Sequence, residues 1–562
     1  MKNIKLLVIL IVGFVLILPS LKPLLKEDFF QMHDYSHVAR LVELDLALKD
    51  GHFPARWSKD LGWGYGMPLF QFYAPLPYYL SEGFHLIGFS FLNAIKVCFG
   101  LTFFVSFLGM YLLAGKFWGK WGGFLAGVVF VYSPYRAVDF YVRGALGELF
   151  AISLIPWILW AITEIFDKRT HKTVIKGSIL LALFLLSHTV LNLICVPLFI
   201  LFGLFYLLIN KGIKNAILPM VSSFALGIGL AGFFLFPAFF EKQFSQVEKL
   251  TSGFSHYAHH FLYLRQFFRG PWGYGGSVGG IEDGLSFHLG KAHLFLALIT
   301  VIVSLFFFVF KKREKSHLLV GFFTAVTLVL VFLSTYHSKV IWDAIPLMAF
   351  IQFPWRFNSL LIVILGFLSG GTVYYLKKII GKSSVIFLII AILIILKVNI
   401  KYFQPEKYVD PSILYYTDRE LISFSMSGVI PDYLPIWVED IPNKVARGEF
   451  QIIRGDPKIK VIDPEIKVID SKTHKLVLEI VSPESSKILL NRNYFPGWRL
   501  TLNGKESNFE YQKSNGLIKV NLSPGNYDLQ LFFEKTLIRI ISEIVTLTSL
   551  LIIVILLFIK RK

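Results

Sequence analysis

Long apolar segments recur along this chain of 562 residues, and they restrict its possible folds more than any other feature. Hydrophobic residues make up 55% of the sequence and charged residues only 17%, which is more apolar surface than a soluble protein of this size can bury. About twelve segments approach the roughly 20 apolar residues that a membrane-spanning helix needs. They cover residues 4–20, 91–114, 120–134, 148–166, 175–190, 191–209, 216–239, 292–310, 317–335, 357–376, 384–400 and 537–558. The sequence therefore predicts a mostly α-helical, polytopic membrane protein.

The basic residues predict how the chain crosses the membrane. The formal net charge of +19 would suit a nucleic-acid partner, but most of the basic clusters fall in short loops between apolar segments. That is the positive-inside pattern, so no nucleic acid is expected. The clusters are residues 116–120, 167–172, 210–215, 311–315 and 377–382 and the tail 560–562. They predict cytoplasmic N- and C-termini in a plasma-membrane protein whose first apolar segment stays uncleaved.

Three regions follow from this topology. Residues 1–400 are expected to form a transmembrane helical domain with two large outer loops, 21–90 and 240–291. Residues 401–536 are expected to form an extracytoplasmic β-rich domain of β-sandwich type, because apolar and polar residues alternate there between turn dipeptides such as Asn503-Gly504. Residues 537–562 return through a final helix to a basic cytoplasmic tail.

Ionisable residues that do not belong to the basic loops gather on the predicted outer side. Such residues are costly at membrane depth and tend to be functional. Glu148, His188, Glu241 and Arg356 each lie directly against an apolar segment, where a hydrated loop does not account for them. We therefore expect a site at the outer ends of the helices.

The stretch HDYSH at residues 33–37 opens the first outer loop. In a helix, His33, His37 and Arg40 share one face, and Asp34 is a neighbour of His37. Two histidines four apart beside an acid also approach the H-E-x-x-H zinc motif, although Asp is shorter than Glu. Three interpretations stay open: a pocket of Asp, His and Arg, a zinc site using His33 and His37, and a hydrated helix beside the membrane.

Residues 50–80 combine Gly62, Gly64 and Gly66 with prolines and many aromatic side chains. The Gly-x-Gly-x-Gly pattern at 62–66 lacks the Lys-Ser/Thr of a phosphate-binding loop. One interpretation is a structured loop at the membrane interface, where Trp and Tyr are favoured. The other is that aromatic faces such as Trp57 stack on a sugar ring or flank a lipid chain.

Several of these motifs resemble those of a known family. They are HDYSHVARL (33–41), GHFPARW (51–57), GWGYGMPLFQFYAPLPYYL (62–80), YVRGALGE (141–148), QFPWRF (352–357) and YFPGWRLTLNG (494–504). They are similar to a bacterial and archaeal membrane-protein family labelled "6-pyruvoyl-tetrahydropterin synthase-related", akin to YfhO-type proteins. The long first outer loop, the many spans and the outer β-domain also resemble the GT-C class of membrane glycosyltransferases.

The GT-C resemblance implies an enzyme that moves a sugar from a polyprenyl-phosphate donor to an extracytoplasmic acceptor, which would be a cell-envelope glycan, a lipid or a protein. By position, the implied acid is Asp34, which would activate the acceptor or bind a divalent cation such as Mg²⁺ or Mn²⁺. We expect the catalytic groups to be Asp34, His37 and Glu148. The residues expected to bind substrate or phosphate are Arg40, Arg143, Arg356, His188, Glu241, Trp57 and Trp355.

Other functions compete with glycosyl transfer. A non-enzymatic lipid or glycan transporter would need polar residues along a path through the membrane, whereas the acids and histidines here cluster at the outer ends of helices. A scaffold for envelope assembly would depend mainly on residues 401–536. A zinc-dependent membrane hydrolase remains a minor alternative that rests on His33 and His37.

Overall fold

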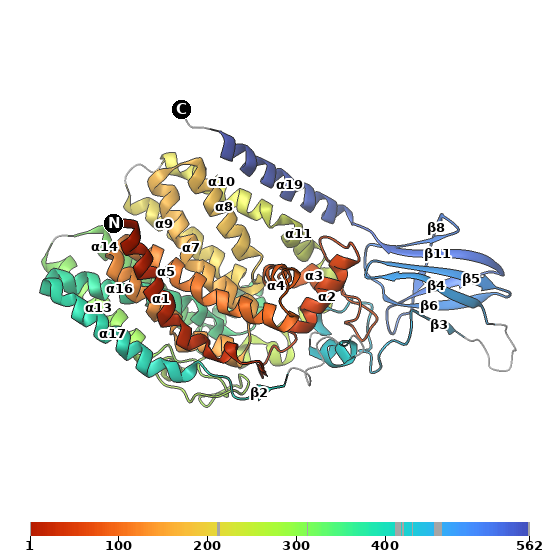
Figure 1. The fold of residues 1–562 in the computed structure, drawn as a ribbon, viewed down its shortest axis with the longest axis horizontal. Helices are drawn as coiled ribbons and strands as arrows, with labels where there is room; N and C mark the ends of the chain where they lie inside the picture. Colours follow the sequence, from red (N-terminus) through yellow and green to blue (C-terminus); the bar gives the residue numbers. More distant parts are fainter. Residues whose placement is uncertain are drawn as a thin grey trace.

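The computed structural model describes residues 2–210, 214–311, 313–410, 418, 421–429, 431–453 and 463–559. A bundle of helices forms one part of the molecule, and a unit of β-strands projects from it (Figure 1). The first helix begins and the last helix ends on the side of the bundle away from the strands (Figure 1). Both ends of the described chain therefore lie on the same side of the bundle.

All of the predicted apolar segments are helical, which confirms the fold class. The long helices are α1 (Lys2–Leu21), α5 (Phe91–Val131), α7 (Leu146–Lys168), α8 (His171–Leu185), α9 (Thr189–Ile209), α10 (Lys214–Leu230), α11 (Gly232–Phe240), α13 (Lys291–Phe310), α14 (Lys315–Leu333), α16 (Asn358–Ile380), α17 (Ser384–Asn399) and α19 (Leu537–Phe558). Shorter helices lie between them, namely α2 (His37–Lys49), α3 (Leu69–Phe72), α4 (Leu76–Leu86), α6 (Pro134–Ala137), α12 (Leu264–Phe268) and α15 (Lys339–Ala344).

The number of membrane crossings depends on how long segments are divided. Within the described residues, eight segments are long and apolar enough to cross a bilayer, or up to nine if the bent pair α10 and α11 is one span. Two of these segments, α5 with 41 residues and 354–402 with 49, are about twice as long as a single crossing requires. The first breaks at Gly119, whose φ of 72° is left-handed, and the second contains both α16 and α17. This division explains most of the difference from the twelve expected segments.

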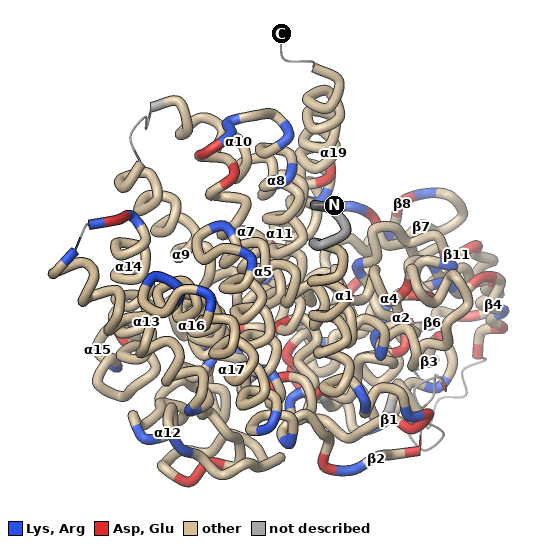
Figure 2. Tube along the Cα trace, turned by 60° about the vertical axis from the view of Figure 1, so that its left-hand side comes forward, with Lys and Arg blue, Asp and Glu red and all other residues tan. Residues whose placement is uncertain are grey.

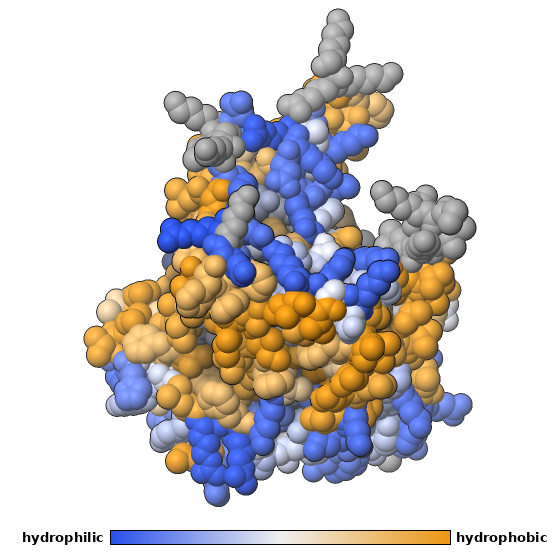
Figure 3. All heavy atoms as spheres, turned by 90° about the vertical axis from the view of Figure 1, so that its left-hand side faces the viewer, coloured by the Kyte–Doolittle hydropathy of each residue, from blue (hydrophilic) through white to orange (hydrophobic). Residues whose placement is uncertain are grey.

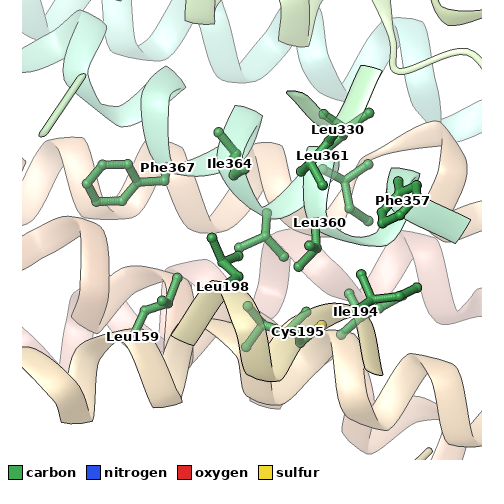
Figure 4. Packing of buried hydrophobic residues seen from close by; sticks show 14 of the residues in the cluster. Leu159, Ile194, Cys195, Leu198, Leu330, Phe357, Leu360, Leu361, Ile364 and Phe367 are labelled. Atoms are coloured by element: carbon green, nitrogen blue, oxygen red, sulfur yellow. The ribbon is translucent and has the colours of Figure 1, made fainter. Parts of the chain in front are cut away.

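An apolar band crosses the face of the molecule drawn in Figure 3, with hydrophilic zones above and below it. Leu305 on α13 and Leu547 on α19 are among the large hydrophobic side chains that the long helices expose. Exposed aliphatic side chains on long helices are expected where lipid is the solvent. Inside the bundle, α7, α9, α14 and α16 pack through a continuous hydrophobic core (Figure 4). Its labelled members are Leu159, Ile194, Cys195, Leu198, Leu330, Phe357, Leu360, Leu361, Ile364 and Phe367.

The segments predicted to be outer loops meet at one end of the bundle, which we call the loop end. Strand β1 (Phe29–Phe30) pairs antiparallel with β2 (Tyr408–Val409), joining the first loop to the region after α17. The Gln246 N–H donates to the Leu434 carbonyl at 2.9 Å, and the Leu262 N–H donates to the Ser334 carbonyl at 2.8 Å. The first outer loop and the 240–291 loop therefore both contact the 401–536 region, and the 240–291 loop also contacts the end of α14.

Most of the predicted basic loops lie at the opposite end, which we call the basic end. Lys116 forms ion pairs with Glu164 at 2.8 Å and with Asp167 at 2.7 Å, which joins the break in α5 to the end of α7. Lys378 pairs with Glu314 at 2.8 Å. Residues 211–213, 312 and 560–562 of the predicted basic clusters lie outside the described residues.

The β-unit consists of two antiparallel sheets packed face to face. One has the order β3 (Phe450–Ile453), β6 (Ser486–Asn493), β10 (Leu517–Leu522) and β9 (Glu510–Tyr511). The other has the order β4 (Glu465–Lys472), β5 (Lys475–Ser482), β11 (Gly525–Phe533), β7 (Trp498–Leu502) and β8 (Lys505–Ser507). Leu478, Leu490 and Leu531 are fully buried in the core between the sheets, as the alternating pattern predicts.

The core of the β-unit is completed by the first loop. Trp57 is fully buried in it, with its ring centre 5.4 Å from that of Trp498 in an edge-to-face arrangement. Phe72 joins the same cluster. An aromatic side chain of this size buries 150–250 Å² and dominates the packing around it. The β-unit and the first loop therefore form one packed structure.

Candidate functional site

Asp34 and Arg40 form a two-point ion pair at the loop end. Arg40, in the first turn of α2, donates through Nη1 to Asp34 Oδ2 at 3.0 Å, and its Nη2 lies 3.0 Å from Oδ1. Arg40 is buried, whereas the Asp34 side chain keeps 27% of its surface exposed. The guanidinium thus fixes the orientation of a carboxylate that solvent still reaches.

Two tyrosines extend this pair into a cluster. Arg40 Nη1 also donates to the hydroxyls of Tyr73 at 2.8 Å and Tyr78 at 3.0 Å. The Tyr73 hydroxyl donates to Asp34 Oδ2 at 3.2 Å, and the Ser36 hydroxyl donates to Oδ1 at 3.1 Å. Burial, the largest single effect, raises the pKa of Asp34, but the charge of Arg40, its hydrogen bonds and the other contacts of the carboxylate together outweigh burial and hold the pKa well below its usual range. Asp34 is therefore ionised at neutral pH.

His37 is held in a single tautomer beneath this carboxylate. Its Nε2 must donate to the Gly144 carbonyl at 2.5 Å, since a carbonyl only accepts. Its Nδ1 then accepts from the Tyr78 hydroxyl at 2.9 Å. Burial lowers the pKa of His37, and the nearby Asp34 offsets only part of this effect. His37 is therefore a neutral wall of the Asp34 cluster, with both ring nitrogens engaged.

The loop that carries Asp34 is attached to the YVRGALGE motif through backbone hydrogen bonds. The N–H groups of His33 and Asp34 donate to the carbonyls of Val142 and Arg143, both at 2.9 Å. This approach requires Gly144, whose φ is 64° and whose added Cβ would lie 2.1 Å from the Met32 sulfur. The attachment brings a second charged cluster next to the first.

Glu148, in the first turn of α7, is the centre of this second cluster. It accepts from Arg143 Nη1 at 2.8 Å and from the Ser359 hydroxyl at 2.9 Å, and Arg356 Nε lies 3.8 Å away. Asp139 Oδ1 also contacts Arg143 Nη1. Glu148 is fully buried, so it organises the arginines and is not itself exposed to solvent.

The second cluster carries surplus positive charge. Burial raises the pKa of Asp139 to about 8, and the negative charge of Glu148 acts in the same direction. Near neutral pH, two arginines therefore face one ionised carboxylate. Burial also lowers the pKa of His188 to about 4, although Glu148 opposes this, so His188 is neutral. The charges of Arg356, Arg143 and Asp34 also act on His188, which places it within range of both clusters.

Trp355 and Arg356 close one side of the Glu148 cluster. The Arg143 guanidinium lies 4.6 Å from the centre of the Trp355 ring, and the Trp355 indole donates to the Ser277 hydroxyl at 3.2 Å. Arg356 Nη1 donates to the Ile351 carbonyl at 2.7 Å and to Gln352 Oε1 at 2.6 Å, while its buried Nε has no hydrogen-bond partner among the described residues. Arg356 therefore retains donor capacity toward the site.

Glu241, just after α11, lies in a different environment. It accepts from Arg539 at 3.0 and 2.9 Å and from Gln71 Nε2 at 2.7 Å, and the Thr536 hydroxyl donates to its other oxygen. Its side chain is only 3% exposed. These contacts attach the start of α19 to the first loop, and they connect Glu241 to neither the Asp34 cluster nor the Glu148 cluster.

Two further predicted residues point away from these clusters. Trp57 lies in the core of the β-unit. His33 Nε2 donates to the Tyr274 carbonyl at 2.9 Å, so it faces the 240–291 loop. Within the described parts of the chain, no group of three or more His, Cys, Asp or Glu side chains is arranged to hold a metal ion. Asp34 is a poor fit for a divalent cation because Arg40 contacts both of its oxygens.

Sequence patterns missed the tyrosines that complete the Asp34 cluster. Tyr73 and Tyr78 belong to the FYAPLPYYL motif, which predicts an interfacial loop but not a hydrogen-bond network. The signal that could have found them is their position on either side of two prolines that fix the local backbone. Ser359 was also missed, because a serine inside an apolar helix has no distinctive pattern.

Comparison with known proteins gives a family and distant structural neighbours. Residues 70–404 match the model of a family described as "6-pyruvoyl-tetrahydropterin synthase related domain; membrane protein". An uncharacterized protein from Lactococcus lactis subsp. cremoris is 27% identical over 238 residues, which are 41% of this chain and 38% of that protein. This chain thus spans well under half of that relative.

Three solved structures share low similarity with this chain. Arabinofuranosyltransferase AftD from Mycobacteria has a TM-score of 0.46 and 14% identity, covering 73% of this chain and 28% of that chain. The Archaeoglobus fulgidus oligosaccharyltransferase has a TM-score of 0.44 and 15% identity, with coverages of 74% and 56%. ArnT from Cupriavidus metallidurans, bound to undecaprenyl phosphate, has a TM-score of 0.38 and 13% identity, with coverages of 76% and 77%.

Proposed function

This chain belongs to the 6-pyruvoyl-tetrahydropterin synthase-related family of membrane proteins, and we propose that it transfers a sugar at the paired Asp34 and Glu148 clusters. The proposed donor is a sugar linked to polyprenyl phosphate, and the proposed acceptor is an extracytoplasmic glycan, lipid or protein. The loop end would then face outward and the two termini would be cytoplasmic, in agreement with the basic loops.

The accessible carboxylate of Asp34 is the observation that carries this proposal. Its position is fixed by Arg40, Tyr73 and Ser36, yet 27% of its surface stays exposed. A carboxylate with a low pKa is a weak base, so it would orient the acceptor hydroxyl and take its proton late, once bond formation to the sugar has made that proton acidic. His37 would help to keep this carboxylate in place.

Arg143 and Arg356 suit the departing phosphate. The hydrogen bonds found for the Arg143 side chain all use Nη1, and the side chain is 12% exposed. Its remaining nitrogens can therefore meet phosphate oxygens, and Arg356, whose Nε lies 3.8 Å from Glu148, adds positive charge beside them. Because Asp139 is largely protonated near neutral pH, the surplus positive charge would stabilise the negative charge that develops on the leaving group.

We propose that no divalent cation binds at Asp34 during transfer. The guanidinium of Arg40 already occupies both carboxylate oxygens, so a cation would have to displace it. In this arrangement the arginines of the Glu148 cluster supply the positive charge that a cation would otherwise provide.

The test is sugar transfer by purified protein in proteoliposomes, using radiolabelled polyprenyl-phosphate sugars and envelope extracts as acceptors. We expect Asp34→Asn to lower turnover by roughly 100-fold or more, because a proton acceptor is removed while the shape is kept. Asp28→Asn is the matched control, since Asp28 is an exposed aspartate six residues earlier in the same loop. Its turnover should equal that of the wild type.

Two outcomes would overturn the proposal. Undiminished transfer by the Asp34→Asn variant, with an unchanged melting temperature, would remove Asp34 from the chemistry. Movement of the labelled lipid across the bilayer, with no sugar transferred by the wild type, would instead identify a transporter.

A further inference from the structure

A hollow of about 160 Å³ lies at the basic end, between the last turns of α7 and the first turns of α8. Its lining residues are Trp160, Ala161, Glu164, Lys168, Thr170, Lys172, Thr173 and Lys176. None of these residues belongs to the Asp34 or Glu148 clusters, so the hollow is separate from the proposed transfer site.

The hollow carries uncompensated positive charge. Its only acid, Glu164, forms ion pairs with Lys168 and, at 2.8 Å, with Lys116. Lys172 and Lys176 are exposed and have no carboxylate partner among the residues that the structure describes. They are four residues apart on α8, where two like charges repel each other and disfavour the helix. An anion between them would remove this repulsion.

The hollow also has an apolar side. Trp160 is half-buried, and its ring centre lies 5.9 Å from Lys176 Nζ. Ala161 and the methylene stems of the lysines continue this apolar surface. A Trp beside Lys side chains is typical of the boundary between hydrocarbon and water. The ligand that suits this hollow therefore combines a negative charge with apolar groups.

The position along α7 places the hollow at headgroup level. Helix α7 has 23 residues, which correspond to about 34 Å at roughly 1.5 Å per residue. This length matches a hydrocarbon core of about 30 Å. Because Glu148 lies at the other end of α7, the hollow is at the opposite membrane surface from the Glu148 cluster. Figure 2 shows basic residues grouped near α8 and α10 at this end of the bundle.

We propose that this hollow binds the headgroup of an anionic phospholipid. The lipid phosphate would lie between Lys172 and Lys176, with the glycerol and first methylenes against Trp160. Basic pockets between membrane helices recognise anionic headgroups in this way. Free phosphate shares the charge but not the apolar part, and the hollow opens where lipid is concentrated, so the lipid is the better match.

The test compares lipid retention by native mass spectrometry after mild delipidation in detergent. Wild-type protein is incubated with equal amounts of phosphatidylglycerol and phosphatidylcholine, as is the double variant Lys172→Gln/Lys176→Gln. The matched control is Lys377→Gln/Lys382→Gln, which removes two exposed lysines of the basic end outside the hollow. We expect wild type and control to retain phosphatidylglycerol preferentially, and the double variant to bind it at least tenfold more weakly.

A second readout separates lipid from soluble phosphate. The melting temperature is measured with phosphatidylglycerol, with inorganic phosphate and with glycerol 3-phosphate. We expect only the lipid to stabilise the wild type, and Trp160→Phe to reduce this stabilisation. Equal lipid retention by the double variant would overturn the proposal, as would equal stabilisation by inorganic phosphate that depends on Lys172 and Lys176. If the double variant does not fold, Lys172→Gln alone decides between these outcomes.

Discussion

Two carboxylate–arginine pairs at the loop end use the same groups in different ways. In one, Arg40 contacts both oxygens of Asp34, and in the other, Arg539 makes two hydrogen bonds to Glu241. Both arginines are only 1% exposed. The carboxylates differ, because Asp34 is 27% exposed and Glu241 is 3% exposed. We call them the open pair and the closed pair.

The two pairs differ in whether the oxygens of the carboxylate stay accessible to solvent or are used in structural contacts. Glu241 also accepts from Gln71 and Thr536, so its oxygens are used in joining α19 to the first loop. Asp34 has comparable support from Tyr73 and Ser36 but remains accessible to solvent. The closed pair is thus suited to stability and the open pair to chemistry, and each prediction below tests that division.

The largest expected effect is on stability at the closed pair. Glu241→Leu leaves Arg539 buried without its partner, which should cost about 3–5 kcal/mol of unfolding free energy. The measurement is thermal or denaturant unfolding in detergent. Asp34→Asn is the comparison, because the amide keeps the shape and solvent reaches the site, and its cost should be about 1 kcal/mol. Equal losses in the two variants would contradict the division into open and closed pairs.

The sequence alone predicted some of the residues that form the open pair. The sequence correctly predicted that Asp34, His37 and Arg40 lie together, but its reason was wrong in part: helix α2 begins at His37, so His33 and Asp34 precede the helix and do not share a helical face with Arg40. It did not reveal that Arg40 would bind Asp34 itself, because the prediction assigned Arg40 to a phosphate. Periodicity gives proximity within an element, whereas partners across the fold require the tertiary structure.

The closed pair shows this limit most clearly. Glu241 and Arg539 are 298 residues apart, and no local pattern connects them. Trp57 is similar, since its partners Trp498 and Phe533 belong to strands more than 400 residues later. The apolar segments and the alternating strands were predictable because each is determined by its own period of side chains. Long-range docking between the first loop and the β-unit is not determined by such a period and was not predicted.

An effect of intermediate size on stability is expected from lowering the pH, through a pair of histidines near Arg539 of the closed pair. His52, after α2, and His474, between β4 and β5, have ring centres 5.3 Å apart, and their buried Nδ1 atoms have no hydrogen-bond partner among the described residues. Burial lowers the pKa of both, that of His52 to about 3. The charged groups that act on the pair are Arg56, Arg539 and Lys535 on His52, and Asp50, Asp470, Lys472 and Lys475 on His474.

Proton linkage determines whether folding stability rises or falls with pH. A histidine that is neutral when folded contributes full stability above its unfolded pKa of about 6.5, and this contribution is lost as pH falls toward the folded value. The melting temperature of the wild type should therefore fall between pH 6.5 and about pH 4 more steeply than that of His52→Gln/His474→Gln. Parallel pH profiles would show that the histidine pair does not control docking of the first loop on the β-unit.

The smallest expected effect is that of Tyr73 on activity at the open pair. Tyr73→Phe removes one donor to Asp34 Oδ2 and one acceptor of Arg40, but Arg40 and Ser36 still hold the carboxylate. Because water can replace the lost hydroxyl at a partly exposed site, we expect a loss of about 1 kcal/mol, or roughly fivefold, in kcat/KM with an unchanged melting temperature. Tyr79→Phe is the control, since its hydroxyl accepts from the Ala55 N–H outside the cluster. At the open pair, loss of one hydrogen-bond donor should lower kcat/KM and leave the melting temperature unchanged. A fall in melting temperature without a change in kcat/KM would therefore show that Tyr73 has a structural role, like the residues of the closed pair.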